Sequence, residues 1–245
     1  MTLSAESFDG WYADRTESPV ADDLVRRMLD LPPGLQSTSL LGGAGLDEVT
    51  AALDLDDTHV LLDLACGRGG YGLEIARRTG CELIGVDFSA VAIEQAQEQA
   101  GDCGTFRVGE LTATGLDSNS VDAVLIVDAF QFADPKLKAL EECRRVLRPG
   151  GRLVITCWEA LDPAGDVLPA RMREVDLAAQ LPQAGFTQVN VLEKSDWRAA
   201  EKRLWDGALA VDAGEDPAMH QMQEEARRVL ANFDDLRRVM AYATA

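Results

Sequence analysis

Apolar positions along this chain follow two alternating patterns. From residue 59 onward, short continuous apolar runs, typical of strands buried on both faces, alternate with segments in which apolar residues recur every three or four positions, typical of helices. The runs predict strands at 60–64, 82–86, 105–108, 121–127 and 152–157, and the intervening segments predict helices at 70–79, 90–100 and 136–147. This alternation predicts βαβ units, in which a parallel sheet carries helices on both faces.

The segments on either side of this region are predicted to be mainly helical. A helix begins at Ser18-Pro19 and ends before Pro32, and its apolar face comprises Val20, Leu24, Met28 and Leu31. A second, short helix lies near 46–53. After the alternating region we expect a helix at 171–181, a strand at 187–193, amphipathic helices at 197–211 and 217–230, and a final strand at 236–243.

These elements together predict an α/β fold. We expect a Rossmann-like, seven-stranded, mostly parallel sheet with helices on both faces, an N-terminal helical arm and a C-terminal helical cap. The arm is expected to span residues 1–54, the α/β core 55–196, the cap insertion 197–234 and an edge strand of the core 235–245. A chain of 245 residues is long enough to bury a core without a metal or disulfide.

The charge balance narrows the classes of partner. Lys and Arg number 23 against 42 Asp and Glu, a net charge of −19, which disfavours nucleic acids and anionic membrane surfaces. The five cysteines are scattered without a C-x-x-C pair, so neither a metal site nor a disulfide is predicted. The N-terminus lacks signal-peptide features, and no apolar run reaches the roughly 18 residues of a membrane span. We expect a soluble, cytoplasmic monomer or homodimer.

The strongest local motif is the segment LLDLACGRGGYG at 61–72. Gly67, Gly69 and Gly72 satisfy G-x-G-x-x-G between a predicted strand and a predicted helix. Asp87, at the end of the next predicted strand, stands about 20 residues after Gly67, where an acid accepts hydrogen bonds from ribose hydroxyls. By itself this pattern is compatible with a nicotinamide dinucleotide.

Asp63, at the end of the first predicted strand, favours a different cofactor. A carboxylate aimed into the crevice would repel a pyrophosphate by about 1–4 kcal/mol at a separation of about 4 Å. It would attract the ammonium and sulfonium groups of a cationic amino-acid nucleoside. The alternative is that Asp63 only caps the turn.

The sequence resembles the class I S-adenosylmethionine-dependent methyltransferases, and most closely their small-molecule members of the ubiquinone/menaquinone and bacterial secondary-metabolite kind. The resemblance covers about 60–195 and rests on the glycine loop followed, in family order, by GVDFS (85–89), VGELTATGL (108–116), SVDAVLIVDAFQF (120–132) and RRVLRPGGRLVI (144–155). Five ordered blocks are much more specific than one glycine loop.

The resemblance implies S-adenosylmethionine as the cofactor and a role for each matching residue. Asp63, Ala65, Gly67 and Gly69 would line its methionine and ribose, and Asp87 would hold both ribose hydroxyls. Phe88 would lie against the adenine face, Glu110 and Leu111 at the adenine edge, and the backbone of Val127 and Asp128 at the methionine end. Two residues depart from the family pattern. Ala65 replaces the commoner first glycine, and Glu110 stands where Asp is more usual.

The sequence does not identify a catalytic residue. The candidates are His220 in the predicted cap, Tyr12 in the arm and Gln131 after the fourth strand, although an amide cannot act as a base. Trp158 and Glu159 follow the fifth predicted strand and are expected to face the crevice. Tyr12, Gln131 and Trp158 are therefore the expected substrate-pocket residues, and the alternative for Tyr12 and Trp158 is a packing role.

The predicted function is methyl transfer to an O, N or C nucleophile of a small organic molecule, in secondary metabolism, by an in-line displacement that depends mainly on positioning. One alternative is a protein that binds S-adenosylmethionine without methylating, such as a cyclase, a decarboxylase or a partner subunit. An NAD-dependent oxidoreductase and a protein methyltransferase are further alternatives.

Overall fold

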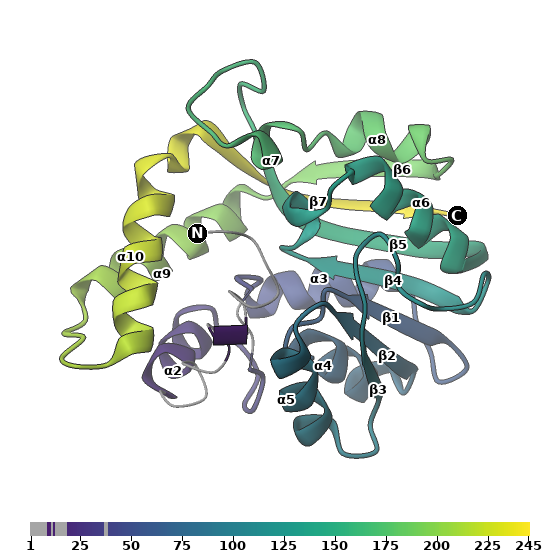
Figure 1. Ribbon diagram of the computed structural model, residues 1–245, viewed down its shortest axis with the longest axis horizontal. Helices are drawn as coiled ribbons and strands as arrows, with labels where there is room; N and C mark the ends of the chain where they lie inside the picture. The colour runs from purple at the N-terminus through teal and green to yellow at the C-terminus, as the bar shows by residue number, and fades with distance from the viewer. Residues whose placement is uncertain (1–8, 11, 13–18, 37–38) are drawn as a thin grey trace.

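The computed structural model describes residues 9–10, 12, 19–36 and 39–245. Its centre is a seven-stranded sheet in the order β3-β2-β1-β4-β5-β7-β6 (Figure 1). The strands are β1 (Val60–Leu64), β2 (Glu82–Asp87), β3 (Thr105–Val108), β4 (Val121–Val127), β5 (Leu147–Ala160), β6 (Thr187–Glu193) and β7 (Leu236–Thr244). β1 to β5 pair in parallel, whereas β7 pairs antiparallel with both β5 and β6. The predicted seven-stranded, mostly parallel sheet is confirmed.

The helices of the described segments connect and cover these strands. They are α2 (Pro19–Met28), α3 (Gly43–Leu53), α4 (Gly70–Thr79), α5 (Ala90–Ala100), α6 (Lys136–Val146), α7 (Ala170–Arg173), α8 (Leu177–Gln183), α9 (Ser195–Ala210) and α10 (Pro217–Ala231). Short 3₁₀ turns stand at Phe130–Phe132 and Phe233–Asp235.

Two hydrophobic clusters cover the two faces of the sheet, because successive side chains of a strand point to opposite sides. On one face, Leu61 of β1 and Leu125 of β4 pack with residues of α3, α4 and α5. On the other, Leu62 and Ile126 pack with residues of α6 and α8. Burial on both faces explains why these strands appear in the sequence as continuous apolar runs.

Three predictions about local structure are wrong. The helix expected at 171–181 is two helices, α7 and α8, and Asp176 caps the second by accepting a hydrogen bond from the Ala179 N–H at 3.1 Å. The apolar face expected for the first helix is wrong in part, because Leu24 and Leu31 are buried whereas Val20 and Met28 are 46% and 37% exposed.

The third wrong prediction concerns β5. This strand extends from Leu147 to Ala160 and does not begin after the Gly150-Gly151 turn. Trp158 and Glu159 therefore lie within the strand and face opposite sides of the sheet. Trp158 lines the crevice as expected. Glu159 instead accepts hydrogen bonds from the Leu177 N–H and from Arg237.

The arrangement of strands creates the crevice that positions the site. The chain leaves β1 toward β2 on one side, whereas β4 lies on the other side, so the connections diverge at the carboxyl ends of β1 and β4. Open α/β sheets bind ligands at such a point. Helices α9 and α10 stand beside this end of the sheet, and α2 packs against both of them (Figure 1).

Candidate functional site

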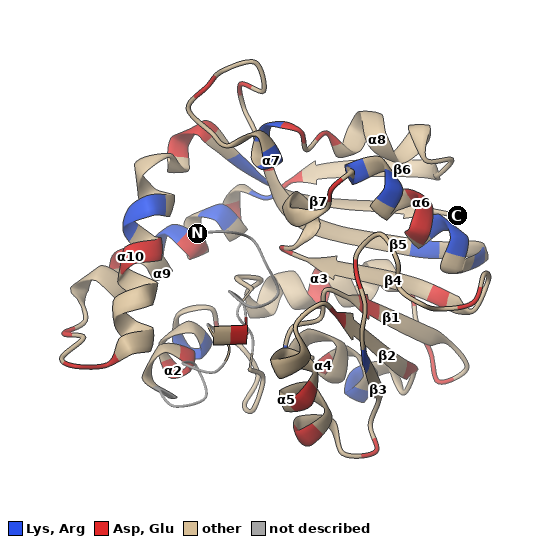
Figure 2. Ribbon diagram, viewed as in Figure 1, with Lys and Arg blue, Asp and Glu red and all other residues tan. Residues whose placement is uncertain are grey.

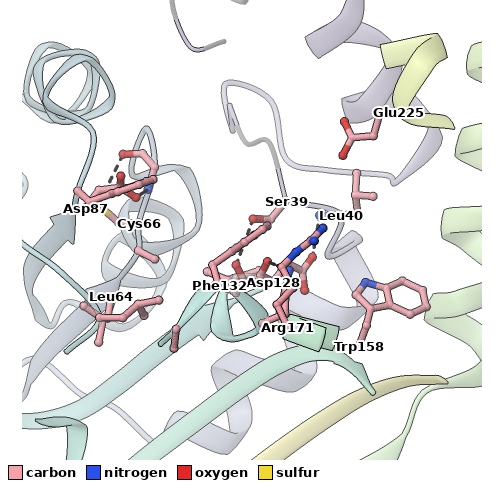
Figure 3. A pocket seen from close by; sticks show the side chains of 18 of the residues that line it. Ser39, Leu40, Leu64, Cys66, Asp87, Asp128, Phe132, Trp158, Arg171 and Glu225 are labelled. Carbon is pink, nitrogen blue, oxygen red and sulfur yellow. Dashed lines mark hydrogen bonds between the residues drawn. The ribbon is translucent and has the colours of Figure 1, made fainter. Parts of the chain in front are cut away.

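A cavity of about 1070 Å³ lies in this crevice. One part is formed by the loops after β1, β2 and β4, and the other is bounded by Trp158 of β5 and by residues of α7, α9 and α10. Figure 3 shows Asp87 and Cys66 at one end of the pocket and Trp158 and Glu225 at the other. The volume is ample for a nucleoside together with a second small molecule.

The glycine loop after β1 brings backbone close to the cavity. Gly67 has φ +53, and a Cβ built on it would lie 2.7 Å from the Tyr12 hydroxyl. A side chain at Gly67 would therefore fill the space beneath Tyr12. Ala65 also adopts a left-handed conformation, with φ 60, which costs a non-glycine residue about 1 kcal/mol. Replacing the usual glycine by Ala65 thus adds backbone strain, not only a methyl group.

Asp87 is held beneath this loop at the end of β2. Its Oδ2 accepts a hydrogen bond from the Gly67 N–H at 2.8 Å and its Oδ1 from the Ser89 N–H at 2.9 Å. The Phe88 N–H also donates to this carboxylate, which still has acceptor capacity for a ligand hydroxyl. Burial raises the pKa of Asp87, although these backbone donors oppose the shift.

Asp63 is the second buried carboxyl of the cavity, with 3% of its surface exposed. Its Oδ2 accepts a hydrogen bond from the Gly72 N–H at 3.1 Å. Burial raises its pKa to about 7, the Gly72 hydrogen bond lowers it, and the neighbouring Asp87 raises it further. Within the described residues no Lys or Arg pairs with Asp63, so a cationic group in the cavity would find a carboxyl without a counter-ion.

Asp128, directly after β4, binds groups from three segments that are far apart in the sequence. Its Oδ2 accepts a hydrogen bond from the Leu40 N–H at 2.9 Å, and its Oδ1 accepts one from Thr156 Oγ1 at 2.7 Å. The same Oδ1 lies 2.5 Å from Nη2 of Arg238, which is completely buried. Because its side chain is occupied by protein groups, Asp128 can meet a ligand chiefly through its backbone.

The N-terminal part of the chain closes over the glycine loop. Tyr12 is 5% exposed and lines the cavity, and Asp9 Oδ1 accepts a 2.5 Å hydrogen bond from Ser89 Oγ at the start of α5. Arg68, within the loop, forms a bidentate ion pair with Asp22 of α2, in which Nη1 and Nη2 donate to the two carboxylate oxygens at 2.8 and 2.9 Å. Helix α2 is therefore tied directly to the loop.

The far end of the cavity contains groups that sequence reasoning missed. Glu201 and Trp205 of α9 and Arg171 of α7 line it together with Trp158. In Figure 3 the side chain of Arg171 points toward the middle of the pocket. No local pattern marks Glu201, because it lies in an amphipathic helix among several other charged residues.

Most of the residues predicted for the site line this one cavity: Tyr12, Asp63, Ala65, Gly67, Asp87, Phe88, Glu110, Leu111, Val127, Asp128, Gln131 and Trp158. Gly69 lies outside the lining and has φ +77 at the start of α4. His220 also lies outside it; its ring nitrogen donates to the Gly214 carbonyl at 2.9 Å. The side chain of Gln131 donates to the Asp128 carbonyl at 2.6 Å.

Two further features of the described residues concern membranes and metals. None of their helices is both long and apolar enough to cross a membrane. Among the same residues no three His, Cys, Asp or Glu side chains gather as metal ligands.

Comparison with known proteins identifies similar sequences. The family profile described as "Methyltransferase domain" matches residues 62–155. The sterol 24-C-methyltransferase ERG6 of Saccharomyces cerevisiae is 31% identical over 71% of this chain and 48% of its own length. The malonyl-[acyl-carrier protein] O-methyltransferase of Methylococcus capsulatus is 29% identical over 76% of this chain and 67% of its own. The chain spans about half the length of several curated relatives it matches.

Solved structures share the fold over nearly the whole chain. The [4+2]-cyclase SpnF superposes on this chain with a TM-score of 0.73 at 20% identity. The aligned region covers 98% of this chain and 96% of the SpnF chain. At this level of identity the likeness concerns the fold.

Proposed function

This chain belongs to the class I S-adenosylmethionine-dependent methyltransferases, and from that membership we propose that it transfers the methyl group of S-adenosylmethionine to an O, N or C nucleophile of a small organic molecule. The observation that carries the proposal is the set of two buried carboxyls, Asp63 and Asp87, on either side of the glycine loop. A role in secondary metabolism is part of the proposal.

The residues of the cavity fit this cofactor. Asp87 has acceptor capacity for the ribose hydroxyls, and Gly67 leaves the space that a side chain would fill. Asp63, buried without a counter-ion among the described residues, suits the ammonium group. Phe88, Glu110 and Leu111 would surround the adenine, and the backbone of Val127 and Asp128 would meet the methionine end, as the family resemblance implies.

S-adenosylmethionine supplies a methyl group on a sulfonium, and a neutral thioether leaves when the methyl is displaced. The protein has to exclude water and align the nucleophile, and positioning of this kind contributes up to about 7–11 kcal/mol. Tyr12 and the segment around Leu40 would cover the cofactor, and Trp158 would offer an aromatic wall to the substrate.

A second candidate is binding of the cofactor without methyl transfer. The observation that favours it is the extent of the match with SpnF, whose name describes a [4+2]-cyclase. The names of the curated relatives favour methyl transfer.

Calorimetric titration with S-adenosylhomocysteine, with NADH as the counter-ligand, tests the cofactor. We expect S-adenosylhomocysteine to bind and NADH not to bind, because a pyrophosphate would lie against Asp63. Micromolar binding of NADH without binding of S-adenosylhomocysteine would refute the proposal.

The variant Asp87→Asn tests the ribose contact. An amide offers one acceptor oxygen where the carboxylate offers two, so we expect S-adenosylhomocysteine to bind about 10- to 100-fold more weakly. Asp206→Asn is the matched control, since Asp206 is exposed on α9 and pairs with Lys202. Equal affinity in the two variants would contradict the ribose assignment.

A further inference from the structure

Glu201 is a buried carboxyl with one free oxygen in the substrate end of the cavity. It is 2% exposed, and Oε1 accepts a hydrogen bond from Trp205 Nε1 at 3.1 Å, one helical turn away. Oε2 is buried and has no hydrogen-bond partner in the described part of the chain. A buried acceptor is costly when left unpaired, by about 1–3 kcal/mol. Because Glu201 lines the cavity, the missing partner is expected to come from a ligand.

The charges that face Glu201 come from three neighbouring elements. Arg238 of β7 lowers the pKa of this carboxyl, whereas Asp128 after β4 and Glu225 of α10 raise it. Burial outweighs them and raises the pKa to about 8. Arg238 is paired with Asp128, stacks over the Trp158 ring at 4.9 Å and forms no ion pair with Glu201.

We propose that Glu201 is the catalytic base of this enzyme, and that its Oε2 takes the proton from the nucleophile of the substrate. The proposal rests on the proposed methyltransferase function and adds to it the residue that the sequence left unidentified.

The step balances as a displacement coupled to a proton transfer. The nucleophile, an X–H group, forms a bond to the methyl carbon, and the bond between that carbon and sulfur breaks with its electron pair going to sulfur. The X–H proton passes to Oε2 of Glu201, which becomes neutral. The Trp205 hydrogen bond to Oε1 holds the carboxyl in place and leaves Oε2 as the oxygen without a protein partner among the described residues. After the product leaves, the proton returns to water.

The surroundings favour a weakly acidic hydroxyl, that of a phenol or an enol, as the nucleophile. Two guanidinium groups, Arg171 and Arg228, line the same cavity, and the pKa of Arg171 is lowered by burial and by the nearby Arg228. Their charges would stabilise a developing oxyanion, and Glu224 and Glu225 of α10 line the same cavity. The rings of Trp158 and Phe233 pack edge to face, with 5.8 Å between their centroids. Such an aromatic surface suits the flat apolar body of a phenol or enol.

Cofactor charge and the protonation of Glu201 should be coupled. A sulfonium in the same cavity would attract the ionised carboxylate, so bound S-adenosylmethionine would lower the pKa of Glu201. S-adenosylhomocysteine lacks that charge. The base is thus ionised before the reaction and neutral after it.

Protons released on binding provide a test that needs no substrate. S-adenosylmethionine and S-adenosylhomocysteine are titrated calorimetrically at pH 8 in two buffers of different ionisation enthalpy. We expect S-adenosylmethionine to release more protons, with an excess of about 0.3–0.6 proton that is present in the wild type and absent in Glu201→Gln. The ligands' own amines titrate similarly in both proteins, so the comparison isolates Glu201. Asp206→Asn, with an exposed carboxyl on the same helix, should behave as the wild type.

The outcomes separate the two proposals. If neither ligand binds, the proposed function fails and the base fails with it. If both bind to Glu201→Gln and the wild type with the same proton release, the assignment of Glu201 is wrong and the cofactor assignment stands. Glutamine has the shape of the neutral acid and can still accept the Trp205 hydrogen bond, so loss of folding is not expected.

A second experiment tests the nucleophile. Phenols and the corresponding benzylamines are screened for uptake of labelled methyl groups at pH 8. We expect turnover of phenols only, and a kcat about 10²- to 10⁴-fold lower in Glu201→Gln, with KM little changed. Methylation of amines but not of phenols would overturn the hydroxyl assignment, and unchanged kcat in Glu201→Gln would overturn the base.

Discussion

At the scale of single residues, the cavity contains two buried carboxyls whose pKa values lie in the neutral range. Burial raises the pKa of Asp63 to about 7 and that of Glu201 to about 8. Glu142, outside the cavity, behaves in the opposite way. The pKa of Glu142 is lowered to about 2, because Arg145 and Thr114 donate hydrogen bonds that outweigh its desolvation. Glu142 is thus paired with a cation, whereas Asp63 and Glu201 form no ion pair within the described residues.

Glu201→Gln is expected to stabilise the protein, and increasingly so as pH rises. The folded pKa of Glu201 is above the ordinary value of 4.5, so the folded state binds more protons than the unfolded state between about pH 4.5 and 8. The stability of the wild type therefore falls across that window, and the variant avoids the loss. We expect a gain of about 3–5 kcal/mol at pH 8 and almost none at pH 4.5, measured by denaturant unfolding. A difference independent of pH would contradict this prediction.

Glu142→Gln is expected to have the opposite dependence. Its folded pKa lies below 4.5, so the carboxylate stabilises the fold above pH 4.5 and this contribution is lost as pH falls toward 2. Arg145 is partly exposed, so solvent screening reduces the effect to about 1–2 kcal/mol at pH 7. Unfolding measured at pH 7 and pH 3 should show the variant less stable than the wild type at both, with a smaller difference at pH 3.

At the scale of elements, the N-terminal helix is joined to the cofactor loop by a few specific bonds. Helix α2 holds Arg68 through Asp22, and the Tyr71 hydroxyl of α4 donates to the Leu41 carbonyl at 2.7 Å. Ser39 Oγ donates to the Val127 carbonyl at 3.2 Å, at the end of β4. The segments before β1 are therefore held by the same loops that form the crevice. A displacement of these segments should change the positions of the loops.

Arg68→Met is expected to loosen α2. The methionine keeps the apolar stem but leaves Asp22 without its guanidinium, at a cost of about 2 kcal/mol, because Asp22 can be partly rehydrated. Hydrogen exchange of the amides of 19–28 should accelerate, and S-adenosylhomocysteine should bind more weakly. Arg26→Met on the same helix is the control, since its ion pair with Asp23 is exposed. Equal exchange in the two variants would show that Arg68 does not anchor the helix.

At the scale of the whole molecule, the excess of acidic groups is spread over many elements, whereas basic groups are fewer (Figure 2). The net charge of −19 implies mutual repulsion that compact folding has to overcome. The negative charge also repels anionic ligands. Within the cavity, the guanidinium groups of Arg171 and Arg228 offset this repulsion locally.

Salt is expected to stabilise the protein. Raising ionic strength from about 0.01 M to 0.15 M shortens the screening length from about 30 Å to about 8 Å, which weakens repulsion between distant charges more than it weakens close ion pairs. The Tm should rise by a few degrees, on the order of 2–4 °C per kcal/mol gained. NaCl and KCl should give equal shifts. A falling Tm, or a shift with one cation only, would contradict screening as the cause.

Local sequence alone determined the sheet and the glycine loop. The strands at 60–64, 105–108, 121–127 and 187–193 have the predicted bounds, and at 60–64 and 121–127 burial on both faces leaves a nearly continuous apolar run. The glycine loop and its acidic residues could also be predicted, since Asp63, Gly67 and Asp87 lie at or just after the ends of adjacent strands. By contrast, the break between α7 and α8 and the exposure of Val20 depend on what packs against them.

The tertiary structure decided what surrounds the substrate end of the cavity. Asp128, Trp158, Glu201 and Arg238 are far apart in the sequence, and each lies in a segment that also reads as an ordinary strand, loop or helix. Only the placement of α9 and β7 beside the carboxyl ends of β4 and β5 buries Glu201 and gives Asp128 a buried cation. Burial and electrostatic neighbours set the chemistry of a carboxyl, and both are properties of the fold rather than of the local sequence.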